Sequence, residues 1–422
     1  MKKIALVAPF VSLPGEPQFN RFLYLCYLWS KTYEVTLVTS AFCHSTKRQR
    51  DRDNERWRDL PFKLALLDEP GYRSNVSFSR FWSHRVFHQS FQGWLDSQLI
   101  AQTGGDFPFD IVYSAFPLIS TNLTLGKLRS SFKFKFVIDV QDIWPDSIFS
   151  ALPFLAQADF LISSLRAKAH QAYSYADGLV AVSKTYLDVA LSRRRSQVPT
   201  HVTYLGSDYQ LIESIEAQSL GSDKIRLLYI GTLSHSYDMK TVVLGFAKLS
   251  ASFDNVELHI LGDGPDRARL EKISGADVFY HGYLPYVEMV AFAKACHIAV
   301  NPIVGSAMQS VTNKLSDYVA FGLPILSSQK NWEAMEIVKA QGGYWFEAGS
   351  AESFAIAAKQ AITDCLKQSR RSHGLVNKRA HKRTHERAHE RVMTSTKPRH
   401  KTDLLFDRRV SYPQITEFIE SL

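Results

Sequence analysis

A lysine and an aspartate lie one helical turn apart in the segment 313–317, and their chemistry suits a charged ligand. The apolar run 298–303 predicts a strand before them, and Gly322 predicts the end of the helix that they open. The first N–H groups of a helix attract phosphate, and Lys314 adds a full positive charge. Asp317 faces the same way because it lies three residues on. The pattern suits a nucleotide diphosphate with its ribose, whereas the alternative is a capped surface helix with a Lys–Asp pair.

A second polar motif, residues 138–146, follows a predicted strand in the first half of the chain and reads IDVQDIWPD. Its aspartates lie just beyond that strand, beside a Trp-Pro pair, where carboxylates could orient the hydroxyl groups of an acceptor. We predict Asp142 in this catalytic role. The alternative is that Asp142 or Asp146 caps a helix while Trp144 packs against the core.

Both segments resemble motifs of the family 4 glycosyltransferases, particularly bacterial members that build capsule, O-antigen and exopolysaccharide repeats. Residues 313–325, NKLSDYVAFGLPI, match the pattern N-K/S-K…E-Y-x-A-x-G-x-P-I of the donor-binding segment, and residues 139–146 match D-x-x-D-L-W-P-E/D. The resemblance covers Met1 to about Cys365. It implies an α/β protein of the GT-B architecture, in which two Rossmann-like, doubly wound parallel-sheet domains face each other across a cleft.

The resemblance also implies roles for single residues. Lys314 is expected to stabilise the charge on the departing diphosphate, and Asp317 to accept hydrogen bonds from ribose hydroxyls. The turn that follows the predicted strand VFYHG is expected to hold the base through backbone groups. The expected donor-binding residues are Gly15, Gly231, Gly282, Tyr283, Leu284, Gln309, Asn313, Lys314 and Asp317.

The sequence departs from the family pattern at Glu16, where the family's Gly-rich loop has a second glycine, and at three further positions. The usual Arg and Lys after Gly231 are Thr232 and Asp238, with Lys240 two residues beyond, so the phosphates would depend on Lys314 and backbone amides. The first acid of the family's Glu-x7-Glu pair is Gln309, which cannot carry charge. These departures keep a non-catalytic, glycosyltransferase-like partner subunit open as an alternative. A nucleotide-sugar epimerase of the same architecture is another.

Short apolar runs alternate with helical stretches in both halves of the chain, which predicts two parallel, doubly wound sheets. The alternation restarts near Gly206. We therefore predict an acceptor-side domain at 1–205, a donor domain at 206–366 and a flexible basic insert at 367–402. The amphipathic segment 412–422 resembles the family's last helix, which crosses back to the first domain.

The net charge of +9 is concentrated in one segment, residues 367–401. That segment has twelve Lys and Arg against two Glu, a net charge of +10, so the remaining residues sum to −1. A nucleic-acid partner is therefore not expected for the body of the protein. The basic segment lacks core residues, and we expect it to meet an anionic membrane surface.

We expect no metal and no other cofactor. His381, His385 and His389 have metal-ligand spacing if helical, but the surrounding Arg and Lys repel a cation. The turn at Gly262 lacks the third glycine of a dinucleotide fingerprint, because position 267 is Arg267.

The expected reaction is transfer of a sugar, with retention, from a nucleotide-sugar donor to a glycan or polyprenyl-linked acceptor. Four cysteines without CxxC spacing predict a cytoplasmic location. A peripheral position on the inner face of the cytoplasmic membrane is also open. The aromatic and basic segment 78–100 predicts either an interfacial helix or a buried helix of the first domain.

Overall fold

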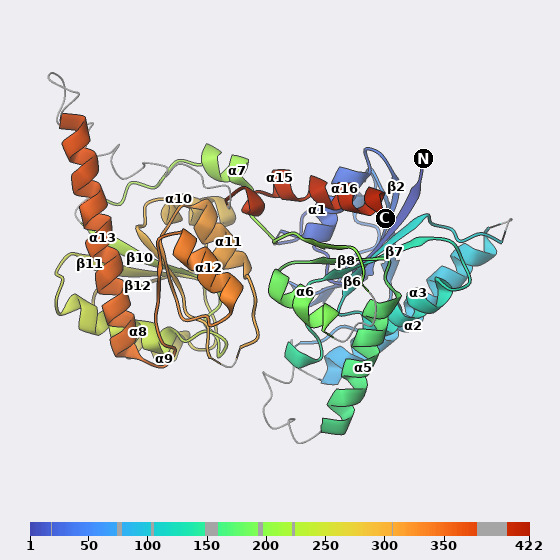
Figure 1. The fold of residues 1–422 in the computed structure, drawn as a ribbon, viewed down its shortest axis with the longest axis horizontal. Coiled ribbons are helices and arrows are strands. Elements are labelled where there is room, and N and C mark those ends of the chain that lie inside the picture. Colours follow the sequence, from blue (N-terminus) through green and yellow to red (C-terminus); the bar gives the residue numbers. More distant parts are fainter. Residues whose placement is uncertain are drawn as a thin grey trace. The chain divides into compact units, whose positions relative to one another are not determined.

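The computed structural model of the protein describes residues 1–17, 19–73, 78–102, 105–147, 159–192, 197–221, 224–305, 307–377 and 403–422. The chain divides into two compact units (Figure 1). Unit 1 comprises Met1–Thr203 and Ser411–Leu422, and unit 2 comprises Tyr204–Val410. Each unit is built on one parallel sheet, which confirms the predicted pair of doubly wound α/β domains.

Unit 1 contains a seven-stranded sheet in the order β5-β2-β1-β6-β7-β8-β9. Its strands are β1 Lys3–Val7, β2 Glu34–Ser40, β5 Lys63–Leu67, β6 Ile111–Phe116, β7 Lys135–Val140, β8 Gly178–Ala181 and β9 Thr200–Val202. A small antiparallel hairpin, β3 Phe42–Cys43 and β4 Arg48–Gln49, and the 3-10 turn η1 Glu55–Trp57 follow β2. The main strands are apolar along nearly their whole length, because helices cover both faces of a parallel sheet.

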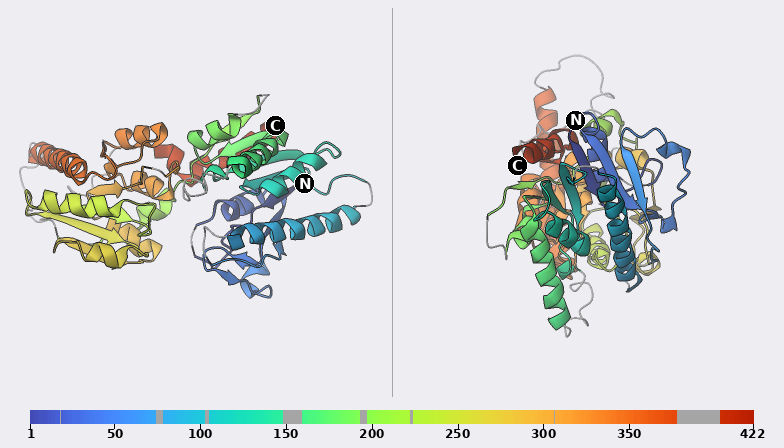
Figure 2. Two further views of the ribbon diagram at one scale, coloured as in Figure 1. Left: turned by 90° about the horizontal axis from the view of Figure 1, so that it is seen from below. Right: turned by 90° about the vertical axis from the view of Figure 1, so that its right-hand side faces the viewer.

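The helices of unit 1 divide between those two faces. They are α1 Arg21–Trp29, α2 Phe78–Ile100, α3 Ile119–Leu128, α5 Asp159–Tyr175, α6 Lys184–Leu191 and α16 Pro413–Ser421. Side chains of α2, α3, α5 and α6 share one apolar core, and those of α1 and α16 share the other. The long helix α2 can be followed beside the strands in Figure 2.

The last helix, α16, packs on unit 1 through apolar and polar contacts. Ile415 and Ile419 are buried beside α1. The Trp29 indole N–H donates to the Thr416 hydroxyl at 2.9 Å. The chain therefore returns to its first unit at its end, in the place that the family resemblance implied for this helix.

The helix predicted over 78–100 forms as α2, and its second half is buried. Phe87, Phe91 and Leu95 lie in the core of unit 1. Near its start, by contrast, Trp82 is 60% exposed and Phe81 is 42% exposed. The buried interpretation therefore holds for the second half of α2. Among the described helices, none is both long and apolar enough to cross a membrane.

Unit 2 contains a six-stranded sheet in the order β12-β11-β10-β13-β14-β15. Its strands are β10 Ile225–Ile230, β11 Val256–Leu261, β12 Val278–Gly282, β13 Ile298–Asn301, β14 Ile325–Ser327 and β15 Tyr344–Trp345. Its helices are α7 Tyr209–Ser214, α8 Met239–Ser250, α9 Arg267–Glu271, α10 Tyr286–Ala293, α11 Asn313–Ala320, α12 Trp332–Ala340 and α13 Ala351–Asn377. The 3-10 turn η3 Asp403–Phe406 and the short helix α15 Arg408–Ser411 lead back to α16.

Helix α13 continues past residue 367, where the sequence predicts the start of the basic insert, and ends at Asn377. The predicted insert therefore begins within a helix. The remainder of the predicted insert, 378–402, with the three histidines at metal-ligand spacing, lies outside the described residues.

Candidate functional site

All the predicted donor residues except Gly15 belong to unit 2, where they lie near the carboxyl ends of its strands. The strand order reverses between β10 and β13, which are neighbours in the sheet although two strands separate them in sequence. Such a reversal leaves a crevice outside the strand ends, where ligands of open α/β sheets bind. Gly231 follows β10, and Lys314 lies in the first turn of α11, which follows β13. The fold thus brings these two predicted residues to the crevice from opposite sides.

Lys314 is held in a cage of two tyrosines. Its ammonium lies 3.5 Å from the centre of the Tyr237 ring and 4.4 Å from that of Tyr229. It also donates a hydrogen bond to the Tyr229 hydroxyl at 3.2 Å. The residue is 8% exposed, and burial lowers the pKa of the ammonium well below its usual value. No ion pair links this ammonium to a carboxylate of the described residues, so an anionic ligand would supply its missing counter-charge.

Gly231 is required where the chain passes this ammonium. Its φ of 141° lies in the region that favours glycine, and a Cβ there would come within 2.7 Å of the Lys314 Nζ. A phosphate that approaches the Gly231 backbone would therefore meet the cation directly. The surface Lys–Asp pair does not form, since Lys314 is buried and bonded to Tyr229.

Two further predicted residues lie beside this cage. Burial raises the pKa of the Tyr237 hydroxyl, and the neighbouring Gln309 side chain offsets part of that rise. The Gln309 carbonyl accepts a hydrogen bond from the Gln329 side chain at 2.6 Å. Asn313 is exposed at the start of α11, which is capped by Thr312. Lys314 and Gln309 thus meet at Tyr237, Gly231 lies beside the Lys314 ammonium, and Asn313 lies at the adjacent helix start.

Asp317 has different surroundings from Lys314, although both lie on α11. Its Oδ1 accepts a hydrogen bond from the Ser207 hydroxyl at 2.5 Å. Burial raises the pKa of the Asp317 carboxyl to about 6, while the Ser207 hydrogen bond and the Arg408 charge oppose that rise. The ribose contact of Asp317 stays a prediction, and one of its oxygens already has a partner within unit 2.

This carboxyl predicts a pH dependence of stability. Its pKa of about 6 in the folded state exceeds the ordinary value of 3.8, so the folded protein holds the proton more tightly than the unfolded chain. The resulting stabilisation is present at low pH and is lost as the pH rises from about 4 to about 6. Asn accepts the same hydrogen bond without titrating. The melting temperature of Asp317→Asn should therefore rise relative to that of the wild type between pH 4 and 7, and parallel curves would contradict the raised pKa.

The turn predicted to hold the base adjoins the same strand ends. Gly262 donates its N–H to the Gly282 carbonyl at 2.7 Å, and Gly231 donates to the Leu261 carbonyl at 2.9 Å. The ends of β10, β11 and β12 are thereby joined in a row. Tyr283 is 78% exposed after this turn, and Leu284 is half-buried. Backbone groups here lie at the same edge as Gly231, as base binding beside a diphosphate requires.

The structure explains one departure from the family pattern. Asp238, at the position of the usual Lys, caps helix α8 by accepting from the Thr241 N–H at 3.2 Å. Its second oxygen accepts from the Gly349 N–H at 2.6 Å. The carboxylate therefore has a structural role, and Lys240 is exposed in the first turn of α8. Sequence reasoning missed the tyrosine cage, because nothing local connects Tyr229 and Tyr237 with a lysine on a later helix.

In unit 1, the two aspartates of the D-x-x-D motif take separate roles. Asp139 lies within β7 and is 0% exposed. It forms an ion pair with Arg21 at 2.9 Å and accepts hydrogen bonds from the Tyr113 hydroxyl at 2.6 Å and the Gln141 amide at 2.7 Å. Asp139 therefore belongs to a buried network, and the expectation that both carboxylates orient a substrate is wrong for this one.

Asp142 lies beyond the end of β7 and makes local hydrogen bonds. Its Oδ1 accepts from the Ile143 N–H at 2.8 Å. Burial raises the pKa of the Asp142 carboxyl, whereas hydrogen bonds from Ser147, Ile143 and Trp144 and the Arg80 charge oppose the rise. A helix cap would accept from an N–H two or three residues on, so the Ile143 bond does not by itself show the capping alternative. The catalytic role of Asp142 stays a prediction that mutation can test.

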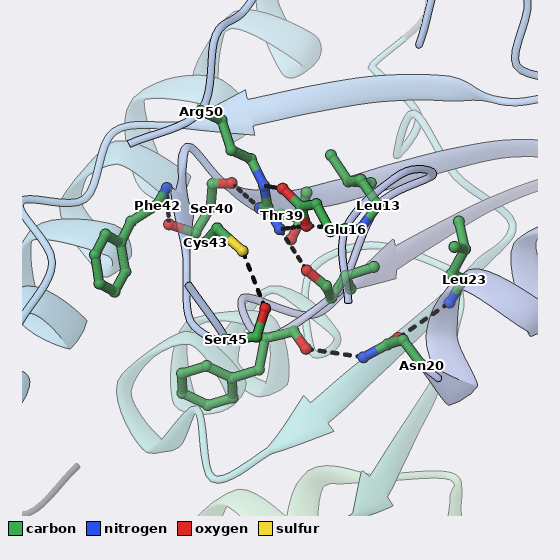
Figure 3. Close-up of polar contacts among 12 residues, drawn as sticks. Leu13, Glu16, Asn20, Leu23, Thr39, Ser40, Phe42, Cys43, Ser45 and Arg50 are labelled. Atoms are coloured by element: carbon green, nitrogen blue, oxygen red, sulfur yellow. Dashed lines mark hydrogen bonds and ion pairs between the residues drawn. The ribbon is translucent and has the colours of Figure 1, made fainter. Parts of the chain in front are cut away.

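Gly15, the remaining predicted donor residue, lies in the loop after β1. Its φ is 89°, and a Cβ would come within 2.3 Å of the Arg56 guanidinium. Glu16, where the family has a second glycine, forms a two-pronged ion pair with Arg50 at 2.7 and 2.6 Å (Figure 3). This pair and the Leu13 N–H hold the pKa of Glu16 below its usual value although burial raises it. Arg50 thereby fixes the loop that carries Gly15.

Comparisons with known proteins fit this arrangement. Residues 224–364 match the family model described as glycosyl transferases group 1. No curated protein sequence matches the chain. Among solved structures, sucrose-phosphate synthase from Thermosynechococcus elongatus is similar, with a TM-score of 0.66 and 15% identity over 100% of this chain and 99% of that one.

Two other solved structures are similar over nearly all of both chains. HepE of Anabaena in complex with UDP has a TM-score of 0.63 and 13% identity, covering 100% of each chain. The lipopolysaccharide outer core galactosyltransferase WaaB has a TM-score of 0.58 and 16% identity, covering 99% of each. At these identities the likeness shows the fold alone, and the fold is GT-B. The chain therefore has the GT-B fold, and its residues 224–364 resemble the group 1 glycosyl transferases.

Proposed function

We propose that the protein transfers a sugar from a nucleotide-sugar donor to a lipid-linked glycan acceptor in the synthesis of a cell-surface polysaccharide. The observation that carries this proposal is the buried Lys314 ammonium beside Gly231 at the strand reversal of unit 2. A diphosphate is the part of such a donor that would neutralise this cation. The likeness to HepE, which binds UDP, supports the donor class, and the likeness to WaaB, a lipopolysaccharide outer core galactosyltransferase, supports the acceptor class.

In the proposed mechanism the anomeric configuration is retained. Lys314 and the N–H groups at the start of α11 stabilise the charge that develops on the departing diphosphate. A donor phosphate oxygen takes the proton of the attacking hydroxyl, and Asp142 orients that hydroxyl. The proposal includes no metal, and Lys314 and backbone amides are the groups that it assigns to the diphosphate. We place the reaction in the cytoplasm, at the inner face of the membrane.

The donor can be identified by a thermal-shift panel of UDP-, GDP- and dTDP-sugars. The sugar nucleotide that raises the melting temperature most is then incubated with and without a lipid-linked glycan. Release of the free nucleoside diphosphate only when the acceptor is present supports transfer. Interconversion of two nucleotide sugars without an acceptor would identify an epimerase. Donor binding without turnover on any acceptor would contradict the proposed reaction.

The acceptor role of Asp142 predicts a selective loss of turnover. Asp142→Asn preserves size and can still accept from the Ile143 N–H, but it removes the negative charge. The transfer rate should fall by about tenfold to a hundredfold, since correct orientation of a reacting group commonly has effects of this size. Donor affinity, measured by calorimetry, should stay unchanged. A variant that melts early and loses donor binding as well would favour the capping alternative.

A further inference from the structure

Two basic side chains of unit 1 converge on one aromatic ring. The Lys47 ammonium lies 4.6 Å from the centre of the Tyr72 ring, and the Arg80 guanidinium carbon lies 5.6 Å from it. Lys47 comes from the turn of the β3–β4 hairpin, whereas Arg80 comes from the first turns of α2. Burial and the Arg80 charge lower the pKa of Lys47 to about 8. The fold therefore holds two like charges near each other at a cost that a bound anion would offset.

The backbone at Lys47 provides a second, independent observation. Its φ of 58° lies in the left-handed region, and it is the one non-glycine residue with positive φ in the described part of the chain. Gly or Asn usually occupies such a position, because a longer side chain is strained there. The hairpin closes by a hydrogen bond from the Lys47 N–H to the Cys43 carbonyl at 2.9 Å. A lysine at this position is a cost to the fold, which a function of its ammonium would explain.

The base of this hairpin is fixed, so the position of Lys47 is determined by the structure around it. Arg50 follows β4 and donates to the carbonyls of Ser40 and Val11 as well as to Glu16 (Figure 3). The Phe42 N–H donates to the Ser40 hydroxyl at 2.8 Å. These bonds join the hairpin to the ends of β1 and β2.

Aromatic rings and imidazoles form the walls around the two cations. Arg80 lies 4.5 Å from the centre of the Trp144 ring, against which His84 stacks at 5.2 Å. The Nδ1 of His44 lies 2.5 Å from the Tyr72 hydroxyl oxygen and 3.3 Å from the Lys47 ammonium, within hydrogen-bond distance of both. Burial and the neighbouring cations lower the pKa of His44 to about 4 and that of His84 to about 3, so both imidazoles are neutral.

One polar atom of these walls is unsatisfied. The Nε2 of His84 is buried and has no hydrogen-bond partner among the described residues. Buried polar atoms usually have partners, and those that lack one commonly mark a site for water or a ligand. A group bound beside Arg80 would supply this partner.

Two carboxylates face the cluster: the Glu69 charge favours the charged forms of Lys47 and Arg80, and the Asp142 charge favours that of Arg80. Glu69 accepts from the Ser83 hydroxyl at 2.6 Å, and burial raises the pKa of its carboxyl. Asp142 accepts from the Ile143 N–H at 2.8 Å, and burial raises the pKa of its carboxyl. The cluster therefore joins two cations to the residue predicted to orient the acceptor.

We propose that Lys47 and Arg80 bind an oxyanion carried by the acceptor, either a phosphate ester or a sugar carboxylate, beside Asp142. That the ligand is an acceptor rests on the proposed function, whereas the anion site rests on the cluster itself. The guanidinium and the ammonium donate charge-assisted hydrogen bonds to the oxyanion, and the aromatic walls contact the apolar faces of the sugar. The site selects anionic acceptors over neutral glycans of the same size.

The test uses the full chain saturated with the nucleoside diphosphate of the donor that the thermal-shift panel identifies, so that the donor site is occupied. Glucose 1-phosphate, methyl glucuronide, inorganic phosphate and neutral methyl glucoside are titrated separately, and binding is followed by ligand-observed NMR. Lys47→Gly and Arg80→Gln should each weaken the preferred anionic probe by about tenfold or more, the loss expected for one charge-assisted hydrogen bond. Arg85→Gln, an exposed change on the same helix, should leave its affinity unchanged.

Lys47→Gly separates binding from folding. Glycine tolerates the φ of residue 47. The melting temperature of Lys47→Gly should therefore equal or exceed that of the wild type, while its affinity for the anion falls. If this variant melts early, Lys47→Asn, which also tolerates that φ, replaces it in the comparison.

The other outcomes are distinct. Tighter binding of glucose 1-phosphate identifies a phosphate ester, and tighter binding of methyl glucuronide identifies a carboxylate. Equal affinity of the wild type and both cluster variants for every anionic probe would overturn the proposal. Inorganic phosphate that binds as tightly as glucose 1-phosphate without inhibiting transfer would overturn its assignment to the acceptor. Failure of the wild type to bind any nucleotide sugar would instead refute the proposed function.

Discussion

Replacement of Arg21 by alanine is expected to destabilise unit 1 by about 3–5 kcal/mol, the range for removing one partner of a buried ion pair. Asp139 is 0% exposed and would keep its place within β7 without a cation. Arg21 also donates to the Thr203 carbonyl at 2.6 Å and lies 5.3 Å from the centre of the Tyr412 ring. Its removal would therefore loosen the C-terminal segment as well. Chemical denaturation, followed by circular dichroism, measures the change.

The loss should depend on pH. Burial raises the pKa of the Asp139 carboxyl, and the Arg21 charge opposes that rise. Without Arg21 the folded pKa rises further above the unfolded value, so the variant loses stability relative to the wild type as the pH rises from about 4. Lys63→Ala removes an exposed pair with Glu34 and should change stability by less than about 1 kcal/mol. An equally small effect at Arg21, independent of pH, would refute the importance of the buried pair.

Replacement of Lys314 by methionine is expected to weaken donor binding by about 1.5–3 kcal/mol, the range for a hydrogen bond to a charged group. The ligand-free variant should melt no earlier than the wild type, since burial alone already disfavours the charged ammonium. Methionine keeps most of the apolar stem between Tyr229 and Tyr237. Calorimetry with the donor measures the binding affinity, and a melting curve without the donor measures the stability of the same sample.

Lys240→Ala is the matched control for this change. Lys240 is exposed in the first turn of α8, two residues beyond the usual family lysine position. Its removal should leave donor affinity unchanged. If Lys240→Ala weakens binding while Lys314→Met does not, the diphosphate lies against α8 and the assignment of Lys314 is wrong. If neither variant loses affinity, the tyrosine cage of Lys314 has only a structural role.

The sequence by itself predicts the elements of this protein well, because each depends on nearby residues. Alternating apolar runs and helical stretches predicted two parallel sheets, and both are present. The segment 78–100 predicted a helix, and α2 has these bounds. A helix was predicted to begin at Asn313 and to end at Gly322, and α11 runs from Asn313 to Ala320. Parallel sheets also bring strand ends to one edge, so the placement of Gly231 and Gly282 together followed from topology.

Only the tertiary structure decided which groups surround each charge. Lys314 meets a tyrosine 85 residues earlier in sequence, and Asp317 meets Ser207, 110 residues earlier. Two residues one turn apart on α11 thus have unrelated partners, and Asp139 of the D-x-x-D motif is part of the core. Local spacing determines which face of a helix or strand a side chain occupies. Its partners depend on which distant elements pack against that face, and burial among those partners fixes the charge and hydrogen bonding that chemistry requires.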